Sequence, residues 1–242
     1  MQITILGDGP LGRAVADAAR QRGDGVLVLG RPVSGLHDRS LLVGADVVVE
    51  ASRADAVATN IAAALEAGCR RAIIATTAWT TDRNLVEGLL VGHEAAAVAA
   101  ANFSIGVTLF GRLVDRAVEL FGHVDGFDPY LVEWHRRAKR DRPSGTAREL
   151  TARIVGQHPN LTASDDLEVV SIRAGSSPGM HLVGFDAPGE SLELRLTARD
   201  RSAYAAGILA AADWLLRMER PAGLHPFDPI VDALLARGTV AA

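Results

Sequence analysis

Cysteine and aromatic residues are both scarce in this sequence. The 242 residues contain one cysteine, Cys69, so the chain has no internal disulfide. No pair of Cys or His residues has the spacing of a zinc motif, and we therefore expect no metal. Aromatic residues make up 5% of the chain, whereas apolar residues as a whole make up 48%. This composition favours a core of small and aliphatic side chains, with helices packed closely on a sheet.

Long hydrophobic runs and an excess of positive charge are also missing. The longest stretch without a charged residue, 95–111, contains Asn102 and Ser104 and is shorter than the roughly 20 apolar residues of a membrane span. The formal net charge of −4 gives no reason to expect nucleic acid or an anionic membrane as a partner. The N-terminus has no basic segment followed by a long apolar stretch, so we expect a cytoplasmic protein without a secretory signal.

Short apolar runs alternate with helical patterns over the first hundred residues. Strands are predicted at 2–6, 25–29, 46–50, 71–75 and 96–101, and helices at 12–22, 54–67 and 82–91. Continuous apolar runs of this length are typical of parallel strands that are buried on both faces. The alternation therefore predicts an α/β fold with a Rossmann-type parallel sheet.

The pattern changes after about residue 105. We expect helices at 106–121, 146–156, 202–218 and 227–236, and strands at 129–134, 168–174, 180–187 and 190–198. The last strand alternates strictly between apolar and polar residues, which predicts one buried face and one face in solvent. We therefore expect two domains. Residues 1–104, completed by 202–242, would bind a dinucleotide, and an inserted α+β domain of residues 105–201 with a mixed sheet would bind the substrate.

A glycine-rich loop follows the first predicted strand. The run Gly7-Asp8-Gly9-Pro10-Leu11-Gly12 has the spacing GxGxxG between a strand and a helix. In such loops the first glycine permits a tight turn, the second lets the backbone approach a pyrophosphate, and the third lets helix and strand pack closely. The sequence thus predicts a dinucleotide site here, the alternative being an ordinary turn between a strand and a helix.

The end of the second predicted strand bears on the choice of cofactor. Enzymes that use NAD usually carry Asp or Glu there to accept hydrogen bonds from the ribose hydroxyls. This chain reads Leu29-Gly30-Arg31-Pro32 instead. Because the guanidinium of Arg31 can pair with a 2′-phosphate, we expect NADPH as the cofactor, with NADH also accepted. The alternative is a surface arginine that binds nothing.

The most informative stretch runs from residue 133 to residue 147. Its sequence is Glu133-Trp134-His135-Arg136-Arg137-Ala138-Lys139-Arg140-Asp141-Arg142-Pro143-Ser144-Gly145-Thr146-Ala147, and half of residues 133–142 are Arg or Lys. Thr146 and Glu149 have the spacing of a capping box, and the helix start near Gly145 offers backbone N–H groups to an anion. A basic cluster beside a histidine and an anion-binding helix start suit a small carboxylated substrate. The alternative from composition alone is a solvated basic loop.

The same stretch resembles the E-x-H-H-x-x-K-x-D-x-P-S-G-T-A signature of the dihydrodipicolinate (4-hydroxy-tetrahydrodipicolinate) reductases. Three further matches follow in the same order along the chain. Ala75-Thr76-Thr77-Ala78 resembles GTTG, Ala100-Ala101-Asn102-Phe103-Ser104-Ile105-Gly106-Val107 resembles A-x-N-F-S-x-G-V, and Ser171-Ile172-Arg173-Ala174-Gly175 with Gly179, His181 and Phe185 resembles S-x-R-x-G…G-x-H…F. The resemblance spans nearly the whole chain.

This resemblance implies roles for individual residues. Lys139 would donate a proton to the substrate as hydride arrives from the nicotinamide, and His135 would help to bind or protonate it. Ser144, Gly145 and Thr146 would hold a carboxylate of a small dicarboxylate substrate, with Arg136 nearby. The nicotinamide side of the cofactor would be lined by residues after two predicted strands: Ala75, Thr76, Thr77, Ala100, Ala101, Asn102 and Phe103. The implied reaction reduces 4-hydroxy-tetrahydrodipicolinate to tetrahydrodipicolinate, a step of diaminopimelate and lysine biosynthesis.

The chain departs from the family pattern at positions that bear on the substrate. Arg136 replaces the second histidine, and Ala-Thr-Thr-Ala at 75–78 replaces GTTG. A related NADPH-dependent reductase of another small carboxylated imine is therefore one alternative, and a non-catalytic dinucleotide-binding sensor is another. A sensor has no need of the proton donor that Lys139 offers. The resemblance also implies a homo-oligomer, a tetramer, formed through the sheet of the inserted domain, and we expect the alternating strand 191–197 to supply the contact face.

Overall fold

The structure, a computed structural model, describes residues 1–32 and 37–236. Contacts within the chain divide it into two compact units. Unit 1 comprises Met1–Ile105 together with the described residues from Arg201 onward, and unit 2 comprises Gly106–Asp200. Among these residues, no helix combines the length and the apolar character needed to cross a membrane.

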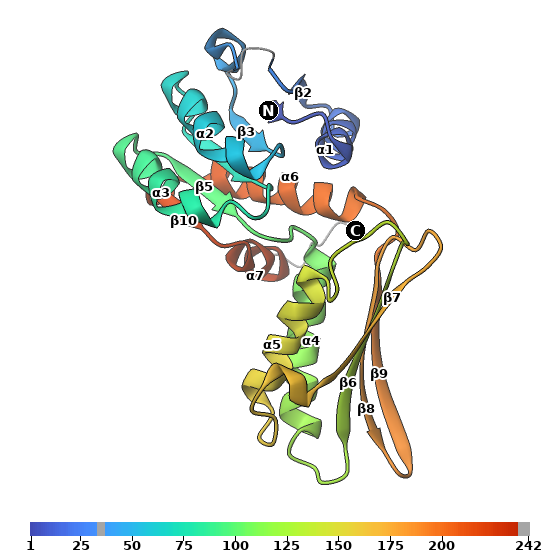
Figure 1. Ribbon diagram of the computed structural model, residues 1–242. Coiled ribbons are helices and arrows are strands. Elements are labelled where there is room, and N and C mark those ends of the chain that lie inside the picture. The colour runs from blue at the N-terminus through green and yellow to red at the C-terminus, as the bar shows by residue number, and fades with distance from the viewer. Residues whose placement is uncertain (33–36, 237–242) are drawn as a thin grey trace. The chain divides into compact units, whose positions relative to one another are not determined.

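Unit 1 is built on a six-stranded parallel sheet (Figure 1). The strands are β1 (Gln2–Leu6), β2 (Gly25–Leu29), β3 (Val47–Glu50), β4 (Arg71–Ile74), β5 (Ala96–Ala99) and β10 (Gly223–His225), in the order β10-β5-β4-β3-β1-β2. Strand β3 shows why this sheet forms, since its valines are β-branched and all four of its residues are buried. The sheet confirms the predicted Rossmann-type fold.

Helices cover both faces of this sheet. They are α1 (Pro10–Gln21), α2 (Val57–Glu66), α3 (Arg83–Gly92), α6 (Ser202–Arg217) and α7 (Asp228–Ala236). Helices α1 and α6 pack together, as do α2 and α3. Helix α1 begins at Pro10, two residues earlier than predicted, because the fixed φ of proline suits the first position of a helix. Leu11 is half-buried in this first turn.

The sixth strand was not predicted. Residues Gly223–His225 pair in parallel with Ala96–Val98 of β5 and extend the sheet by one strand. Three residues that include a glycine give no periodic signal, so only the pairing with β5 reveals the strand.

The strand order reverses at β1, which has β2 on one side and β3 on the other. Because every pairing in the sheet is parallel, the carboxyl ends of all six strands lie along one edge. Open α/β sheets bind their ligands at this edge, beside the strand where the order reverses. The glycine loop follows β1 and therefore lies at that point.

Unit 2 has a mixed four-stranded sheet with two helices. The sheet has the order β7 (Glu168–Arg173), β6 (Asp128–His135), β8 (Met180–Ala187) and β9 (Glu190–Thr197), and the helices are α4 (Ile105–Phe121) and α5 (Gly145–Gln157). Strands β6 and β7 are parallel, whereas β8 is antiparallel to both β6 and β9. This arrangement confirms the predicted mixed sheet.

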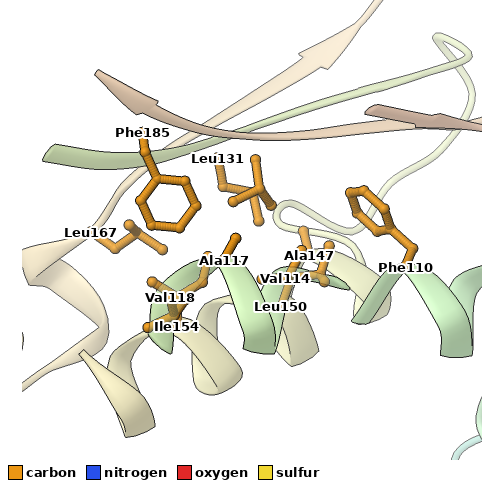
Figure 2. Close-up of a cluster of buried hydrophobic side chains, with 11 residues drawn as sticks. Phe110, Val114, Ala117, Val118, Leu131, Ala147, Leu150, Ile154, Leu167 and Phe185 are labelled. Atoms are coloured by element: carbon orange, nitrogen blue, oxygen red, sulfur yellow. The ribbon is translucent and has the colours of Figure 1, made fainter. Parts of the chain in front are cut away.

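A single apolar cluster joins the sheet of unit 2 to its helices. Figure 2 shows Leu131 and Phe185 descending from the strands onto Val114, Val118 and other residues of the helices. Leu131 and Phe185 are fully buried. On β9, the leucines at 192, 194 and 196 pack against this cluster and the residues between them face solvent, as the alternation predicted. The cluster lies on one face of the sheet and leaves the other face uncovered within unit 2.

Candidate active site

The glycine loop of unit 1 has the shape of a phosphate cradle. Gly7 has a φ of +119°, and a Cβ there would collide with the backbone of Ala51. A Cβ on Gly12 would collide with the carbonyl oxygen of Gly7, so both positions require glycine. A Cβ on Gly9 would instead meet nothing within 4 Å, and Gly9 is the N-cap of α1. An open backbone at a helix N-terminus fits a pyrophosphate.

Asp8 of the glycine loop, predicted to bind the cofactor, lies beside the end of β2. Gly30 follows β2 directly, and a Cβ on it would lie 3.2 Å from a carboxylate oxygen of Asp8. Asp8 thus brings an acid close to the place where NAD enzymes carry one. Arg31 is exposed next to Gly30. The hydrogen bond and charge of Arg53, with a smaller contribution from Arg31, lower the pKa of Asp55. This end of the edge therefore offers both an anion and a cation.

The loops after β4 and β5 lie farther along the same edge. Ala75 and Thr76 are buried, Thr77 is exposed, Ala100 and Asn102 are half-buried, and Ala101 is exposed. The ring of Phe103 packs edge-on against Phe227, with 5.1 Å between their centroids. Ala78 has a φ of +63°, a left-handed conformation that costs an L-residue energy. Glycine in the family's GTTG avoids this cost, so the alanine here is strained.

A buried acid, Glu50, lies between the glycine loop and the β4 loop. It ends β3 and is fully buried, and its carboxylate accepts hydrogen bonds from Asn60 Nδ2 at 3.1 Å and from the backbone N–H of Ser52 at 3.3 Å. Burial raises the pKa of Glu50, against the effect of these hydrogen bonds. The backbone of Ala75 donates to the Glu50 carbonyl at 2.8 Å, which ties the β4 loop to this strand.

In unit 2, strand register gathers a cluster of polar side chains on the inner face of the sheet. Glu133 of β6 pairs with Ser171 of β7 and His181 of β8, and His135 pairs with Arg173. Side chains two residues apart in a strand share a face, so all five lie on the face that carries Leu131 and Phe185. The inner face is therefore apolar at one end and polar at the other. We call these five residues the Glu133 cluster.

Glu133 is the centre of this cluster. It is fully buried, and its Oε1 accepts hydrogen bonds from the Ser144 backbone N–H at 3.0 Å, from Ser171 Oγ at 2.6 Å and from Arg173 Nη2 at 2.6 Å. Burial alone would raise the pKa of Glu133. The nearby His181 ring and hydrogen bonds from Ser144, Ser171 and Arg173 outweigh it and hold the pKa far below its usual range. Glu133 is therefore an anion at neutral pH.

His135 and Lys139, the predicted catalytic pair, both lie in unit 2. His135 is buried, and burial together with the charges of His181, Lys139 and Arg173 lowers the pKa of its imidazole to about 4. Lys139 is half-buried in the loop after β6, where its Nζ pairs with Asp141 at 2.9 Å. His135 is thus neutral at physiological pH, whereas the Lys139 amine forms an ion pair with a carboxylate.

The start of α5 lies directly after this loop. Ser144 is the N-cap, and its Oγ accepts the Ala147 N–H at 3.2 Å. The predicted capping box of Thr146 and Glu149 is wrong, because the helix begins at Gly145 and places Thr146 within its first turn. The helix N-terminus nevertheless lies where the anion seat was predicted. Gly145 is exposed and Thr146 half-buried, while Arg136 is exposed in the loop.

Glu133, His135 and His181 also have the spacing of a metal-ligand set, because one nitrogen or oxygen atom of each lies within 4.8 Å of the others. The Arg173 guanidinium already pairs with Glu133 at 2.6 Å. The positive charge of Lys139 also acts on His135. Two fixed cations beside the same three residues disfavour a third, so the arrangement suits a hydrogen-bonded network better than a metal ion.

Comparison with known proteins identifies the family of this chain. The family described as dihydrodipicolinate reductase, C-terminus, matches residues 106–228. A 4-hydroxy-tetrahydrodipicolinate reductase of Exiguobacterium sp. is 33% identical over 240 residues, which cover 93% of each chain. The chain belongs to the 4-hydroxy-tetrahydrodipicolinate reductase family. A second reductase of this name, from Zymomonas mobilis, is 33% identical over 96% of this chain and 97% of its own.

The fold of this reductase family member is also that of solved structures. A dipicolinate-bound dihydrodipicolinate reductase from Paenisporosarcina sp. TG-14 is similar with a TM-score of 0.71 at 19% identity, covering 93% of this chain and 97% of its own. An engineered D-amino acid dehydrogenase bound to NADP+ is similar with a TM-score of 0.52 at 15% identity, covering 99% of each chain. Because the chain belongs to a family of reductases, the protein is an oxidoreductase.

Sequence reasoning assigned no role to four members of the Glu133 cluster. Glu133, Ser171, Arg173 and His181 all belong to the motifs that carry the family resemblance, but strand-forming residues around them made them look like parts of ordinary strands. One signal was available. Glu133 with His135, and Ser171 with Arg173, are polar pairs spaced by two inside predicted strands, which places each pair on one face.

Proposed function

We propose that the protein reduces 4-hydroxy-tetrahydrodipicolinate to tetrahydrodipicolinate, a step of diaminopimelate and lysine biosynthesis. The observation that carries this proposal is the position of Lys139, a charged amine in the short loop between the buried His135 and the start of α5. Such a loop offers a proton donor next to an anion-binding helix end, as reduction of a dicarboxylated ring requires. Relatives of this name at 33% identity over nearly the whole chain support the same substrate.

The chemistry divides between the cofactor and unit 2. The substrate loses its 4-hydroxyl group and a hydrogen of an adjacent ring carbon as water, which conjugates the ring, and the nicotinamide, when bound, would supply a hydride to that ring. Lys139 donates a proton to the ring as negative charge develops there. His135 is neutral at this pH and therefore binds the substrate through a hydrogen bond. The two residues thus have separate tasks, one as acid and one as a polar contact.

The carboxylates of the substrate would bind at the start of α5 and in the basic loop before it. The partial positive charge of the helix N-terminus at Gly145 and Thr146 favours an anion, and Ser144 holds the first turn in place. Arg136 is exposed, so its guanidinium is accessible to a second carboxylate. Two anion-binding groups suit a dicarboxylate better than a substrate with one carboxyl group.

Unit 1 would hold the cofactor along the carboxyl edge of its sheet. The open backbone at Gly9 fits the pyrophosphate. Arg31 would pair with the 2′-phosphate of NADPH, while the Asp8 carboxylate would accept a hydrogen bond from a ribose hydroxyl of NADH. We therefore propose NADPH as the preferred cofactor, with NADH also accepted. The loops at 75–77 and 100–103 would lie on the nicotinamide side.

We also propose that the protein assembles as a tetramer through the uncovered face of the sheet in unit 2. The predicted contact strand, β9, turns Glu193 and Arg195 to this face. The apolar side chains on it come from β6 and β7 instead, where Trp134, Val170 and Ile172 are 38%, 41% and 39% exposed. Light scattering at micromolar concentration would test this, and a monomer would refute it.

The activity can be tested with substrate made in situ from pyruvate and aspartate semialdehyde. We expect the protein to oxidise NADPH in this mixture and to be inactive when either precursor is omitted. If the protein binds NADPH but does not oxidise it with this substrate, the assignment fails. Reduction of another small carboxylated imine, suggested by Arg136 in place of histidine, would then take its place.

A further inference from the structure

Three buried atoms of the Glu133 cluster lack a hydrogen-bond partner, namely Glu133 Oε2, His135 Nδ1 and Arg173 Nε, and the first two lie close together. Glu133 Oε1 has three donors, but Oε2 has none, and the Nδ1 atom of His135 has no partner either. The two atoms are 3.3 Å apart. Buried polar atoms almost always find a partner, and an anionic oxygen without a donor is especially costly. At this separation each of the two atoms can serve as the hydrogen-bond partner of the other.

We propose that Glu133 is a positioning residue that holds His135 in the tautomer with its proton on Nδ1, leaving Nε2 as a hydrogen-bond acceptor for the substrate. The contact between Nε2 and the substrate rests on the proposed function, whereas the tautomer of His135 does not. A neutral imidazole carries one ring proton, and a carboxylate oxygen beside Nδ1 attracts that proton to Nδ1. The structure around Nε2 agrees. A Cβ on Gly179 would lie 3.2 Å from Nε2, so glycine leaves space beside this nitrogen.

His181 competes less well for the same oxygen. Its Nε2 lies 3.7 Å from Glu133 Oε2, farther than His135 Nδ1, and is 3.2 Å from Ser144 Oγ. Ser144 Oγ accepts the Ala147 N–H, so its own hydroxyl proton can be donated to His181. His181 therefore has a partner in Ser144, whereas His135 Nδ1 has only Glu133.

Glu133 also links His135 to the other parts of the site. Its Oε1 accepts the N–H of Ser144, the N-cap of α5. Arg173 Nη2 donates both to Glu133 and to the carbonyl of Asp141, at 2.6 Å and 2.5 Å, and the Asp141 carboxylate pairs with Lys139. One carboxylate thus connects the neutral histidine, the proposed carboxylate seat and the loop of the proton donor. Loss of its charge should disturb all three together.

The test is NMR of the full-length protein with ¹⁵N-labelled histidine. At neutral pH the wild type should show His135 with a protonated Nδ1 and an unprotonated Nε2, the signals being assigned by their absence from His135→Gln. In Glu133→Gln the amide group can donate to Nδ1, so the proton should move to Nε2. This variant should also lower kcat at least tenfold while the Kd of NADPH, which unit 1 would bind, stays within about twofold. Glu133→Asp keeps the charge and should retain the Nδ1 proton.

Ser171→Ala is the matched control. It removes one of the three donors to Oε1 but leaves the charge of Glu133 and its Oε2 atom unchanged. It should therefore keep the wild-type tautomer. A change of tautomer in Ser171→Ala would mean that any damage to the cluster suffices, and the specific role of Oε2 would be lost.

Each outcome decides the proposal. A wild-type His135 that carries its proton on Nε2, or a Glu133→Gln protein with an unchanged tautomer, overturns it. If Glu133→Gln does not fold, the wild-type spectrum alone decides. If the wild type has the expected tautomer but does not oxidise NADPH with the in-situ substrate, the proposed function fails and the positioning of His135 by Glu133 stands.

Discussion

Removing the charge of Asp8 should change the cofactor preference of the protein. The Asp8 carboxylate lies 3.2 Å from the place of a Cβ on Gly30, where a ribose hydroxyl would find an acceptor and a 2′-phosphate would find a like charge. In Asp8→Asn, loss of a charge-assisted hydrogen bond at an exposed site should weaken NADH binding by about 1 kcal/mol, or about fivefold. Relief of repulsion between charges several ångströms apart in water should strengthen NADPH binding by slightly less, about fourfold. The ratio of the two affinities should therefore shift by about 20-fold.

The assay is a fluorescence titration of each cofactor into wild type, Asp8→Asn, Arg31→Ala and Asp17→Asn. Arg31→Ala should weaken the binding of NADPH about tenfold and leave the binding of NADH unchanged, because only NADPH has the phosphate with which Arg31 would pair. Asp17→Asn removes one exposed charge from α1 without altering the glycine loop, so it should leave the ratio within about twofold. An unchanged affinity for NADH in Asp8→Asn would refute the role of this carboxylate. If Asp17→Asn shifted the ratio of the two affinities as much as Asp8→Asn, the change would be an effect of net charge and not of the position of Asp8.

Three further predictions concern catalysis and stability. Lys139→Ala should lower kcat by about 10²–10⁴-fold while NADPH binding stays near normal, and the neighbouring Arg137→Ala should lower it far less; stopped-flow turnover that survives in Lys139→Ala would exclude a proton donor there. The pKa of His135 is lowered from 6.5 to about 4, so the folded protein binds fewer protons than the unfolded chain between these values. Urea unfolding should therefore show stability being lost as the pH falls from about 6.5 to about 4, by up to about 3 kcal/mol, and His135→Gln should flatten this part of the profile. Ala78→Gly should raise the free energy of unfolding by about 0.5–1 kcal/mol because it relieves a left-handed alanine at φ +63°, whereas glycine at Ala67, where φ is −78°, should lower it.

Local sequence patterns were sufficient to predict most of the secondary structure and the family. The valine-rich run of β3 is buried on both faces, and the leucines of β9 point to one side, because strand period and apolar character are properties of the sequence alone. The signature at 133–147 led to the family that the comparisons support. Strand β10 escaped prediction because three residues become a strand only when a partner is present.

Most of the polar contacts at the candidate site depend on the tertiary structure. The acid beside Gly30 is Asp8, which lies 22 positions earlier in the chain. The residues at the end of β2 therefore could not reveal it. The low pKa of His135 arises from burial and from neighbours on other strands, and the charge of Glu133 depends on Arg173, 40 positions away. The sequence by itself determined which residue types carry the chemistry and the periods that place them on strands or loops. Register between strands, burial and contacts between distant segments decided their protonation and their partners, because electrostatic interactions depend on distance in space and not on distance along the chain.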